Sequence, residues 1–184
     1  MFISLGTKIH NDAKPRLELL VKNSIASKIF SKDSSLWGPE AEQEASIRLG
    51  WTDPIDTAGE LVPQILKLRE ELNSAGVSRV VLCGMGGSSL APEVICKSEG
   101  AELFVLDSTS PTTVRNALQD LEKTVVVVSS KSGSTVETDS QKRIFEQEFQ
   151  KAGIDPSSRI IIVTDPGSPL MLDSQKKGYT IFEA

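Results

Sequence analysis

The sequence contains only two cysteines, Cys83 and Cys96, among 184 residues. Two cysteines are too few for the disulfide framework that holds small secreted domains together. Cys83 ends an apolar run, and Cys96 falls in the helical segment that follows it, where a small apolar side chain fits. We therefore expect both thiols to be buried and inert in a reducing compartment.

Long apolar runs and runs of basic residues are also missing. No run approaches the ~20 apolar residues that cross a bilayer, and the first ten residues lack the basic start and long apolar core of a signal peptide. The net charge of −5 and the lack of a basic run argue against a nucleic-acid surface. We expect a cytoplasmic protein that binds neither membranes nor nucleic acid.

The composition is that of an ordinary folded domain, with 39% apolar and 24% charged residues. The first 56 residues read as a helical lead-in, because apolar residues recur at helical spacing from Leu17 to Ile25. Trp37-Gly-Pro39 breaks this pattern and opens a second helix. A loop is expected from Trp51 to Thr57, and then a helix from about Thr57 to Ala75, capped by Gly76.

From residue 79 onward, apolar runs alternate with helical segments. Val- and Ile-rich strands that are each followed by a helix are typical of a parallel sheet covered on both faces. We therefore predict an α/β domain over residues 57–184, with a doubly wound, five-stranded parallel sheet. The strands are expected at Arg79–Cys83, Leu103–Asp107, Thr124–Ser129, Arg159–Thr164 and Tyr179–Phe182. The helices that separate them are expected at about Ser89–Ser98, Pro111–Gln119, Ser134–Lys151 and Pro169–Lys176.

A glycine-rich loop, Gly84–Pro92, follows the first predicted strand. Its three glycines allow the backbone to approach a ligand, and Ser88 and Ser89 stand where a helix would be capped. The simplest interpretation is a tight strand-to-helix turn. A dinucleotide-binding fingerprint, with Asp107 as the ribose ligand, is an alternative. It fails at its third glycine position, which is Ser89, and it leaves the next loop unexplained.

A hydroxyl-rich loop, Ser130–Thr135, follows the third predicted strand and has four hydroxyl residues and one lysine within six positions. A helix is expected to begin at Ser134, and the unpaired N–H groups and dipole of a helix start attract anions. A capping box between Ser134 and Glu137 is the structural alternative, but it would use fewer hydroxyl residues than the four that this loop contains. We interpret this loop as a phosphate-binding loop. For the third loop, Thr164–Pro169, we favour a plain turn, with contact to the ligand as the alternative.

Together, two of these segments resemble a known family. Gly84-Met-Gly-Gly-Ser-Ser-Leu-Ala-Pro and Ser130-Lys-Ser-Gly-Ser-Thr-Val-Glu-Thr are similar to the two signatures of the sugar isomerase (SIS) fold. More narrowly, they resemble the first SIS domain of the glucose-6-phosphate isomerase family. The resemblance is strongest from about residue 79 to residue 172, and it implies a flavodoxin-like, three-layer αβα domain.

The resemblance also implies a role for each loop residue. Ser130, Ser132 and Thr135 would hold a sugar phosphate through their hydroxyls, and Lys131 through its backbone amide and charge. The residues implied on the sugar side are Gly87 and Ser88. Gly86, Ser89 and Ser134 are further candidate site residues, and Glu137 would have a supporting role rather than transfer a proton. Neither a cofactor nor a metal is expected.

Members of this family interconvert glucose 6-phosphate and fructose 6-phosphate through an enediol, and the full-length enzyme is expected to be a homodimer. The reaction needs a carboxylate base and charge-stabilising groups, which the family carries in motifs downstream of this region. No such motif appears here, and His10, the one histidine, falls in the lead-in, where we expect an incidental surface position. We therefore expect a phosphosugar-binding part of a longer isomerase that is inactive alone. A stand-alone phosphosugar-sensing module is the alternative, although no helix-turn-helix signal accompanies it.

Overall fold

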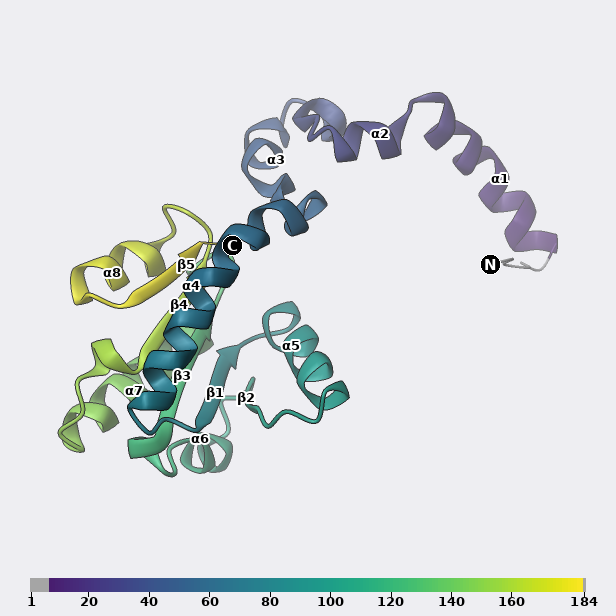
Figure 1. Ribbon diagram of the computed structural model, residues 1–184. Coiled ribbons are helices and arrows are strands. Elements are labelled where there is room, and N and C mark those ends of the chain that lie inside the picture. Colours follow the sequence, from purple (N-terminus) through teal and green to yellow (C-terminus); the bar gives the residue numbers. More distant parts are fainter. Residues whose placement is uncertain (1–6, 184) are drawn as a thin grey trace. The chain divides into compact units, whose positions relative to one another are not determined.

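The computed structural model describes residues 7–183, without the side chains of residues 7, 8, 10 and 54–57. The chain divides into two compact units between Glu60 and Leu61, and Figure 1 shows the elements of both. The side chain of His10, expected at the surface, lies outside the described residues. The assignment of residues 1–56 and 57–184 as separate domains stays a prediction.

The first unit contains the helices α1 (Thr7–Lys22), α2 (Ile25–Phe30), η1 (Ser34–Trp37), α3 (Glu42–Arg48) and η2 (Leu49–Thr52), of which η1 and η2 are 3-10 turns. The helix predicted through Ile25 is interrupted, because Ser24 adopts a left-handed conformation with φ 52°. The second predicted helix begins at Glu42 rather than at Pro39. Of the described side chains in this unit, only that of Leu49 is buried.

The loop predicted from Trp51 to Thr57 is largely wrong. η2 continues to Thr52, and α4 (Pro54–Ser74) begins two residues later. Proline suits the first position of a helix because the N–H that it lacks would have no partner there. The C-terminal cap at Gly76 is confirmed: its φ is 78°, and the next N–H, of Val77, donates to the carbonyl of Leu72 at 3.0 Å.

The second unit contains the predicted five-stranded parallel sheet, which is confirmed. Its strands β1 (Arg79–Gly84), β2 (Phe104–Leu106), β3 (Thr124–Ser129), β4 (Ile160–Thr164) and β5 (Thr180–Glu183) lie in the order β2-β1-β3-β4-β5. All neighbouring pairs are parallel. The chain moves from β1 to one side and then returns to the other, so the topological switch point lies between β1 and β3.

Helices α5 (Gly87–Ser98), α6 (Pro111–Ala117), α7 (Val136–Lys151) and α8 (Pro169–Lys177) follow the first four strands, and short 3-10 turns precede β3 and β4. The helix starts predicted near Ser89 and Ser134 each differ from the observed starts by two residues. α5 begins earlier because Gly86 turns the chain at its N-cap, and α7 begins later because Thr135, not Ser134, is its N-cap.

Two apolar clusters fill the space on either side of the sheet. In one, alternate strand residues such as Val81, Val126 and Ile162 pack with Phe145 and Phe149 of α7, whose ring centroids are 5.9 Å apart. The other cluster, on the opposite face, joins Val125, Ile161 and Phe182 to Leu61, Leu68 and Leu72 of α4. The result is the predicted three-layer arrangement, which Figure 1 shows with α4 across one face.

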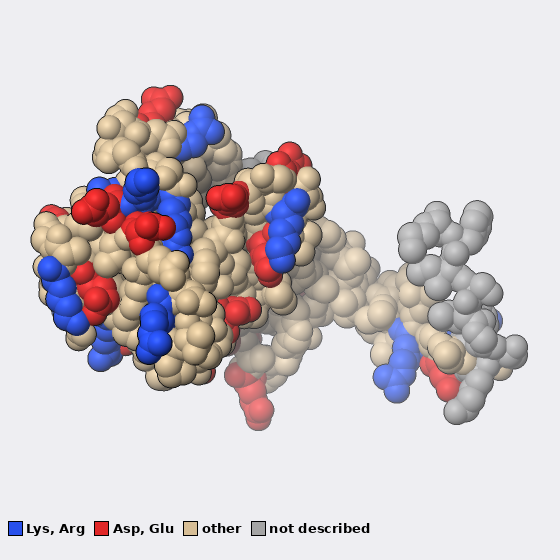
Figure 2. All heavy atoms as spheres, turned by 90° about the horizontal axis from the view of Figure 1, so that it is seen from below, with Lys and Arg blue, Asp and Glu red and all other residues tan. Residues whose placement is uncertain are grey.

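The two cysteines differ in burial. Cys83 is fully buried, and burial raises the pKa of its thiol to about 12, so it stays protonated at neutral pH as expected. Cys96 is only half-buried, which differs from the expectation. Within residues 7–183, none of the helices combines the length and apolar character of a membrane span. Acidic and basic side chains are intermixed on the face that Figure 2 shows.

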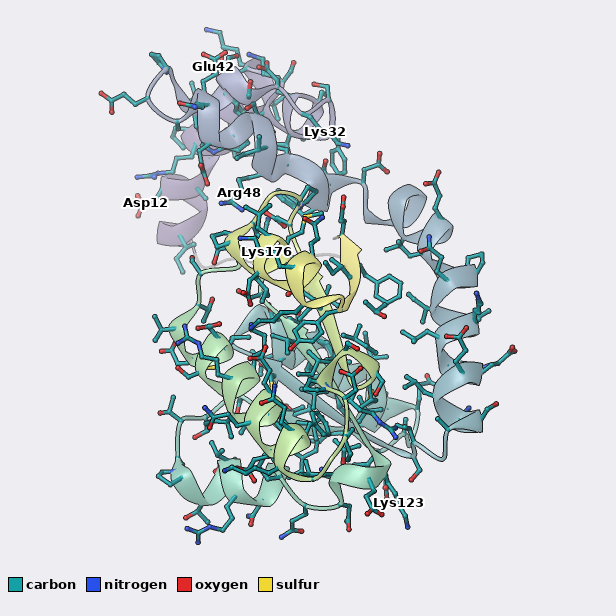
Figure 3. All side chains as sticks on the ribbon, turned by 90° about the vertical axis from the view of Figure 1, so that its left-hand side faces the viewer. Asp12, Lys32, Glu42, Arg48, Lys123 and Lys176 are labelled. Atoms are coloured by element: carbon teal, nitrogen blue, oxygen red, sulfur yellow. The ribbon has the colours of Figure 1, made fainter. Side chains whose placement is uncertain are left out.

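A partly buried charge cluster, which the sequence patterns do not predict, joins α7 to α8, drawn green and yellow in Figure 3. Lys142 has a side chain that is 1% exposed, and its Nζ lies 2.7 Å from Asp173 and 3.2 Å from Glu146. Lys177 bridges the same two carboxylates, each at 3.0 Å. The hydroxyl of Tyr179 also donates to Glu146, at 2.8 Å. Each buried charge therefore has partners of opposite sign.

The two carboxyl groups in this cluster have lowered pKa values. Burial by itself would raise the pKa of Glu146, but hydrogen bonds from Lys177 and Tyr179 and the charge of Lys142 outweigh it. The same balance, with Lys142 and Lys177 as donors, lowers the pKa of Asp173. Carboxyl groups of this kind stabilise the fold above their unfolded-state pKa values of about 4, and the stabilisation is lost as the pH falls through the lower, folded values.

We expect Glu146→Gln to lower the free energy of unfolding at pH 7 by about 2–3 kcal/mol, because it leaves Lys142 buried with one carboxylate fewer. The deficit should shrink as the pH falls from 5 to 3, since the wild-type protein then loses the same charge. Urea unfolding followed by circular dichroism at several pH values measures both effects. Glu148→Gln is the control, because Glu148 pairs with the exposed Lys151. A deficit that is the same at pH 3 and pH 7 would contradict the assignment.

Candidate functional site

The glycine-rich and hydroxyl-rich loops leave the sheet side by side. Gly84, the last residue of β1, pairs with Ser129, the last residue of β3. Paired strands lie about 4.8 Å apart, so the loops that begin at Met85 and Ser130 start next to each other at the switch point. Lys123, labelled in Figure 3, precedes β3 and marks the opposite edge of the sheet. This register therefore brings the two loops together at the carboxyl ends of the strands.

The glycine-rich loop turns directly into α5. A side chain at Gly84 would lie 3.1 Å from the carbonyl oxygen of Ser88, so the glycine lets the first turn of the helix lie against the strand end. Gly86 is the N-cap, with φ 58° and ψ −121°, a conformation that glycine adopts most readily. The predicted capping by Ser88 and Ser89 is therefore wrong, because both residues already lie inside the helix.

The candidate residues of this loop differ in exposure. Gly87 is exposed, with open space where a side chain would be, and Ser88 is half-buried. Ser89 is fully buried, and its hydroxyl donates to the carbonyl of Gly86 at 3.0 Å. Because this bond uses its one proton, Ser89 has the weakest case as a ligand contact. Asp107, which the dinucleotide alternative needs, is exposed just after β2.

The hydroxyl-rich loop closes on itself. Ser130 is 4% exposed, and its N–H donates to the carbonyl of Val163 at 3.0 Å, which extends the pairing of β3 with β4. The Ser130 hydroxyl lies 3.1 Å from that of Thr135. The Gly133 N–H donates to the carbonyl of Ser130 at 3.2 Å. The fold thus brings the first and last hydroxyls of the predicted phosphate loop together.

The other polar residues of this loop lie at its surface. Lys131, Ser132 and Ser134 are exposed. The N–H and the hydroxyl of Ser134 both donate to the hydroxyl oxygen of Ser132, at 3.3 and 3.0 Å. Ser132 therefore keeps its own proton for another acceptor, whereas the Ser134 hydroxyl is already used.

The N-terminus of α7 opens onto this loop. Thr135 is its N-cap and makes no side-chain cap hydrogen bond, so the alternative of a capping box between Ser134 and Glu137 is not formed. The first N–H groups of the helix therefore lack a side-chain acceptor from the cap residue, which is the arrangement that binds anions. Glu137 is half-buried in the first turn, where a carboxylate is favoured by the helix dipole.

Two residues that the sequence reading did not select also contribute to this edge. Thr164, at the end of β4, donates its hydroxyl to the carbonyl of Ser130 at 2.7 Å. Gln141 of α7 donates its side-chain amide to the carbonyl of Ser108, after β2, at 3.2 Å. Hydroxyl and amide residues at these positions also suit ordinary capping and surface roles, so sequence alone had no means of selecting them.

Comparison with curated proteins identifies relatives for part of the chain. No family model matches it. The glucose-6-phosphate isomerase of Chlamydia trachomatis is 34% identical over 118 residues, covering 58% of this chain and 22% of the relative. That of Campylobacter jejuni is 29% identical over 142 residues, covering 73% of this chain and 34% of the relative. The chain thus spans between about a fifth and a third of the length of these relatives.

Solved structures give a similar result. The crystal structure of a glucose-6-phosphate isomerase from Chlamydia trachomatis matches 72% of this chain and 27% of that chain, with a TM-score of 0.59 and 30% identity. A hypothetical protein from Thermus thermophilus matches 97% of this chain and 41% of that chain, with a TM-score of 0.68 and 25% identity. These findings confirm the resemblance that the two loop motifs predicted.

The contact between Gly133 and the third loop generates a prediction. Gly133 has φ 64°, and a side chain there would lie 2.7 Å from the Ser168 side chain and 3.0 Å from that of Leu170. Gly153 has a similar φ of 74° but open space around it. Both alanine variants incur the left-handed cost of about 1–2 kcal/mol. We expect Gly133→Ala to lose about 1–3 kcal/mol more through overpacking.

Urea unfolding of the two variants beside the wild-type protein measures this difference. Equal losses in Gly133→Ala and Gly153→Ala would mean that the hydroxyl-rich loop does not rest on the third loop.

Proposed function

Because the chain is related to the glucose-6-phosphate isomerases over more than half of its length, we propose that it is the phosphosugar-binding part of such an enzyme. The full enzyme interconverts glucose 6-phosphate and fructose 6-phosphate through an enediol, in glycolysis and gluconeogenesis. In this proposal residues 57–184 form an SIS-type domain, residues 1–56 are its helical lead-in, and the full enzyme is a cytoplasmic homodimer.

The observation that carries the proposal is the Ser130–Thr135 hydroxyl pair, 3.1 Å apart, at a helix start that no cap side chain occupies. When one hydroxyl donates to the other, one proton of the pair remains for an outside acceptor. A phosphate oxygen placed there can accept that proton together with N–H groups of the first turn of α7. Ser132 adds a further free proton, and Lys131 adds a charge and a backbone amide.

The sugar end of the ligand belongs, in this proposal, on the neighbouring loop. Gly87 and Ser88 lie in the first turn of α5, which follows β1, and the last residue of β1 pairs with the residue before Ser130. The open space at Gly87 allows the backbone to approach a ligand closely. Glu137, half-buried in the first turn of α7, orients neighbouring polar groups and does not transfer the proton.

We expect Ser130→Ala and Thr135→Val each to weaken the binding of fructose 6-phosphate by about 1.5–3 kcal/mol, which is roughly 10- to 150-fold, since each removes a charge-assisted hydrogen bond. Isothermal titration calorimetry measures the affinity, and thermal unfolding checks that the fold is retained. The control is Ser140→Ala, because the exposed Ser140 hydroxyl donates within its own helix, to the carbonyl of Val136. Unchanged affinity in both site variants would mean that the loop is only structural.

The same titration with NAD tests the dinucleotide alternative. Binding of NAD that Asp107→Ala abolishes, without binding of the sugar phosphate, would replace the proposed function. A phosphosugar-sensing module would also bind the sugar phosphate, and Ser130→Ala and Thr135→Val would weaken this binding too. It would be distinguished by a protein partner that the ligand recruits or releases.

We expect the chain to show no turnover of glucose 6-phosphate to fructose 6-phosphate in a coupled assay, even at saturating substrate. The transfer between C1 and C2 needs a carboxylate base and groups that stabilise the enediol charge, and none of the motifs of this chain provides them. Measurable isomerisation that Thr135→Val removes would overturn this expectation and would assign the base to a residue of this chain.

A further inference from the structure

The position of Ser130 is set by the end of β4. Among the residues that we assign to the phosphate, Ser130 is buried, Thr135 is half-buried, and Lys131 and Ser132 are exposed. The Ser130 N–H donates to Val163 at 3.0 Å, and its carbonyl accepts the Thr164 hydroxyl at 2.7 Å. The hydroxyl of Ser130 is therefore aimed by hydrogen bonds that its own backbone makes to a different strand.

The direction of the hydrogen bonds beneath the loop can be deduced by counting protons. A carbonyl only accepts, so the Thr164 hydroxyl must give its single proton to Ser130. The Thr164 and Ser168 hydroxyls lie 2.8 Å apart, so Ser168 must be the donor of that pair. The Ser168 oxygen in turn accepts the N–H of Met171, at 3.1 Å. One chain of donors thus runs from α8 through Ser168 and Thr164 to Ser130.

This chain of donors is sealed from solvent. Thr164 is 1% exposed and Ser168 is 7% exposed. Both hydroxyl protons are used in the hydrogen bonds of this donor chain, so neither Thr164 nor Ser168 can donate to a ligand. Hydrogen bonds that follow one another in the same direction polarise one another. A buried chain of donors of this kind favours one conformation of the backbone at Ser130, where the chain of donors ends.

Two further contacts hold the loop on the same support. The Asp165 N–H donates to the carbonyl of Lys131 at 3.2 Å. The α-carbon of Gly133 lies so close to Ser168 that a side chain on the glycine would meet it at 2.7 Å. Three points of the loop, at residues 130, 131 and 133, therefore rest on the end of β4 and the segment that follows it.

We propose that Thr164 and Ser168 are positioning residues that hold the phosphate loop in its binding conformation without touching the ligand. This inference rests on the proposed function. The apparent affinity for a ligand is the intrinsic affinity multiplied by the fraction of molecules whose loop is in the binding conformation. Loss of the support lowers this fraction and so weakens binding, even though no ligand contact is removed. The end of β4 and the turn after it thus support the site.

The test compares two isosteric changes, one at the carboxyl end of β4 and one at the amino end of β3. Thr164→Val removes the hydroxyl proton given to Ser130. Thr124→Val is the matched control, because Thr124 is also fully buried and its hydroxyl donates to the carbonyl of Asp120 at 2.8 Å, before β3. Thr164→Val should weaken fructose 6-phosphate binding about tenfold, as expected when the competent loop falls to about a tenth of the population. Thr124→Val should lower the melting temperature and leave the affinity unchanged, and Thr164→Ser should restore binding.

Hydrogen exchange without ligand provides a second measurement. The Gly133 and Asp165 amides, which donate to the carbonyls of Ser130 and Lys131, should exchange faster in Thr164→Val than in Thr124→Val. If the wild-type chain binds no sugar phosphate, the proposed function fails, and the exchange rates still decide whether Thr164 holds the loop. If Ser130→Ala weakens binding while Thr164→Val changes neither affinity nor exchange, the positioning role is wrong and the proposed function stands.

Discussion

The parallel pairing of β1 with β3 is the interaction on which both the core and the candidate site depend. The two strands pair over six positions, from Arg79 opposite Thr124 to Gly84 opposite Ser129. Within this register Val81 and Val126 face the same apolar cluster, beneath α7. A shift of one strand by one residue would turn its side chains to the other face of the sheet. It would also displace the glycine-rich loop relative to the hydroxyl-rich loop. The apolar core therefore sets how the two loops align at the carboxyl ends of the strands, which we call the polar edge.

The polar edge divides its hydroxyls between support and recognition. The buried hydroxyls of Thr164, Ser168 and Ser89 give their protons to protein acceptors. The exposed Ser132 keeps its proton, and the pair of buried Ser130 and half-buried Thr135 keeps one proton between them. A hydroxyl without a partner costs little in water and about 1–3 kcal/mol in the interior. Residues of the same type thus take different roles according to their burial and to the acceptors beside them.

The sequence allowed the sheet to be predicted well and the loop supports poorly. The strands are nearly continuous runs of valine and isoleucine, such as Val125–Val128, and these runs are typical of a sheet buried on both faces. The glycine and hydroxyl motifs could likewise be placed at strand ends by counting residues. The contact of Gly133 with Ser168 could not be predicted, because it joins residues 35 positions apart and depends on how β3 and β4 pair. The Lys142 cluster was missed for a similar reason, since a lysine in a helix is usually exposed.

The proposed recognition of a phosphate rests on directed donors more than on charge. The protein carries a net charge of −5, and Glu137 and Asp139 lie in the first turn of the helix that faces the loop. Against these carboxylates the loop itself has one cation, Lys131, which is exposed to water and so screened. Hydroxyl and N–H donors act at short range and only when they point at the acceptor. Such a site needs a backbone held in one conformation, and this requirement explains why so many of its polar groups are used to hold the loop.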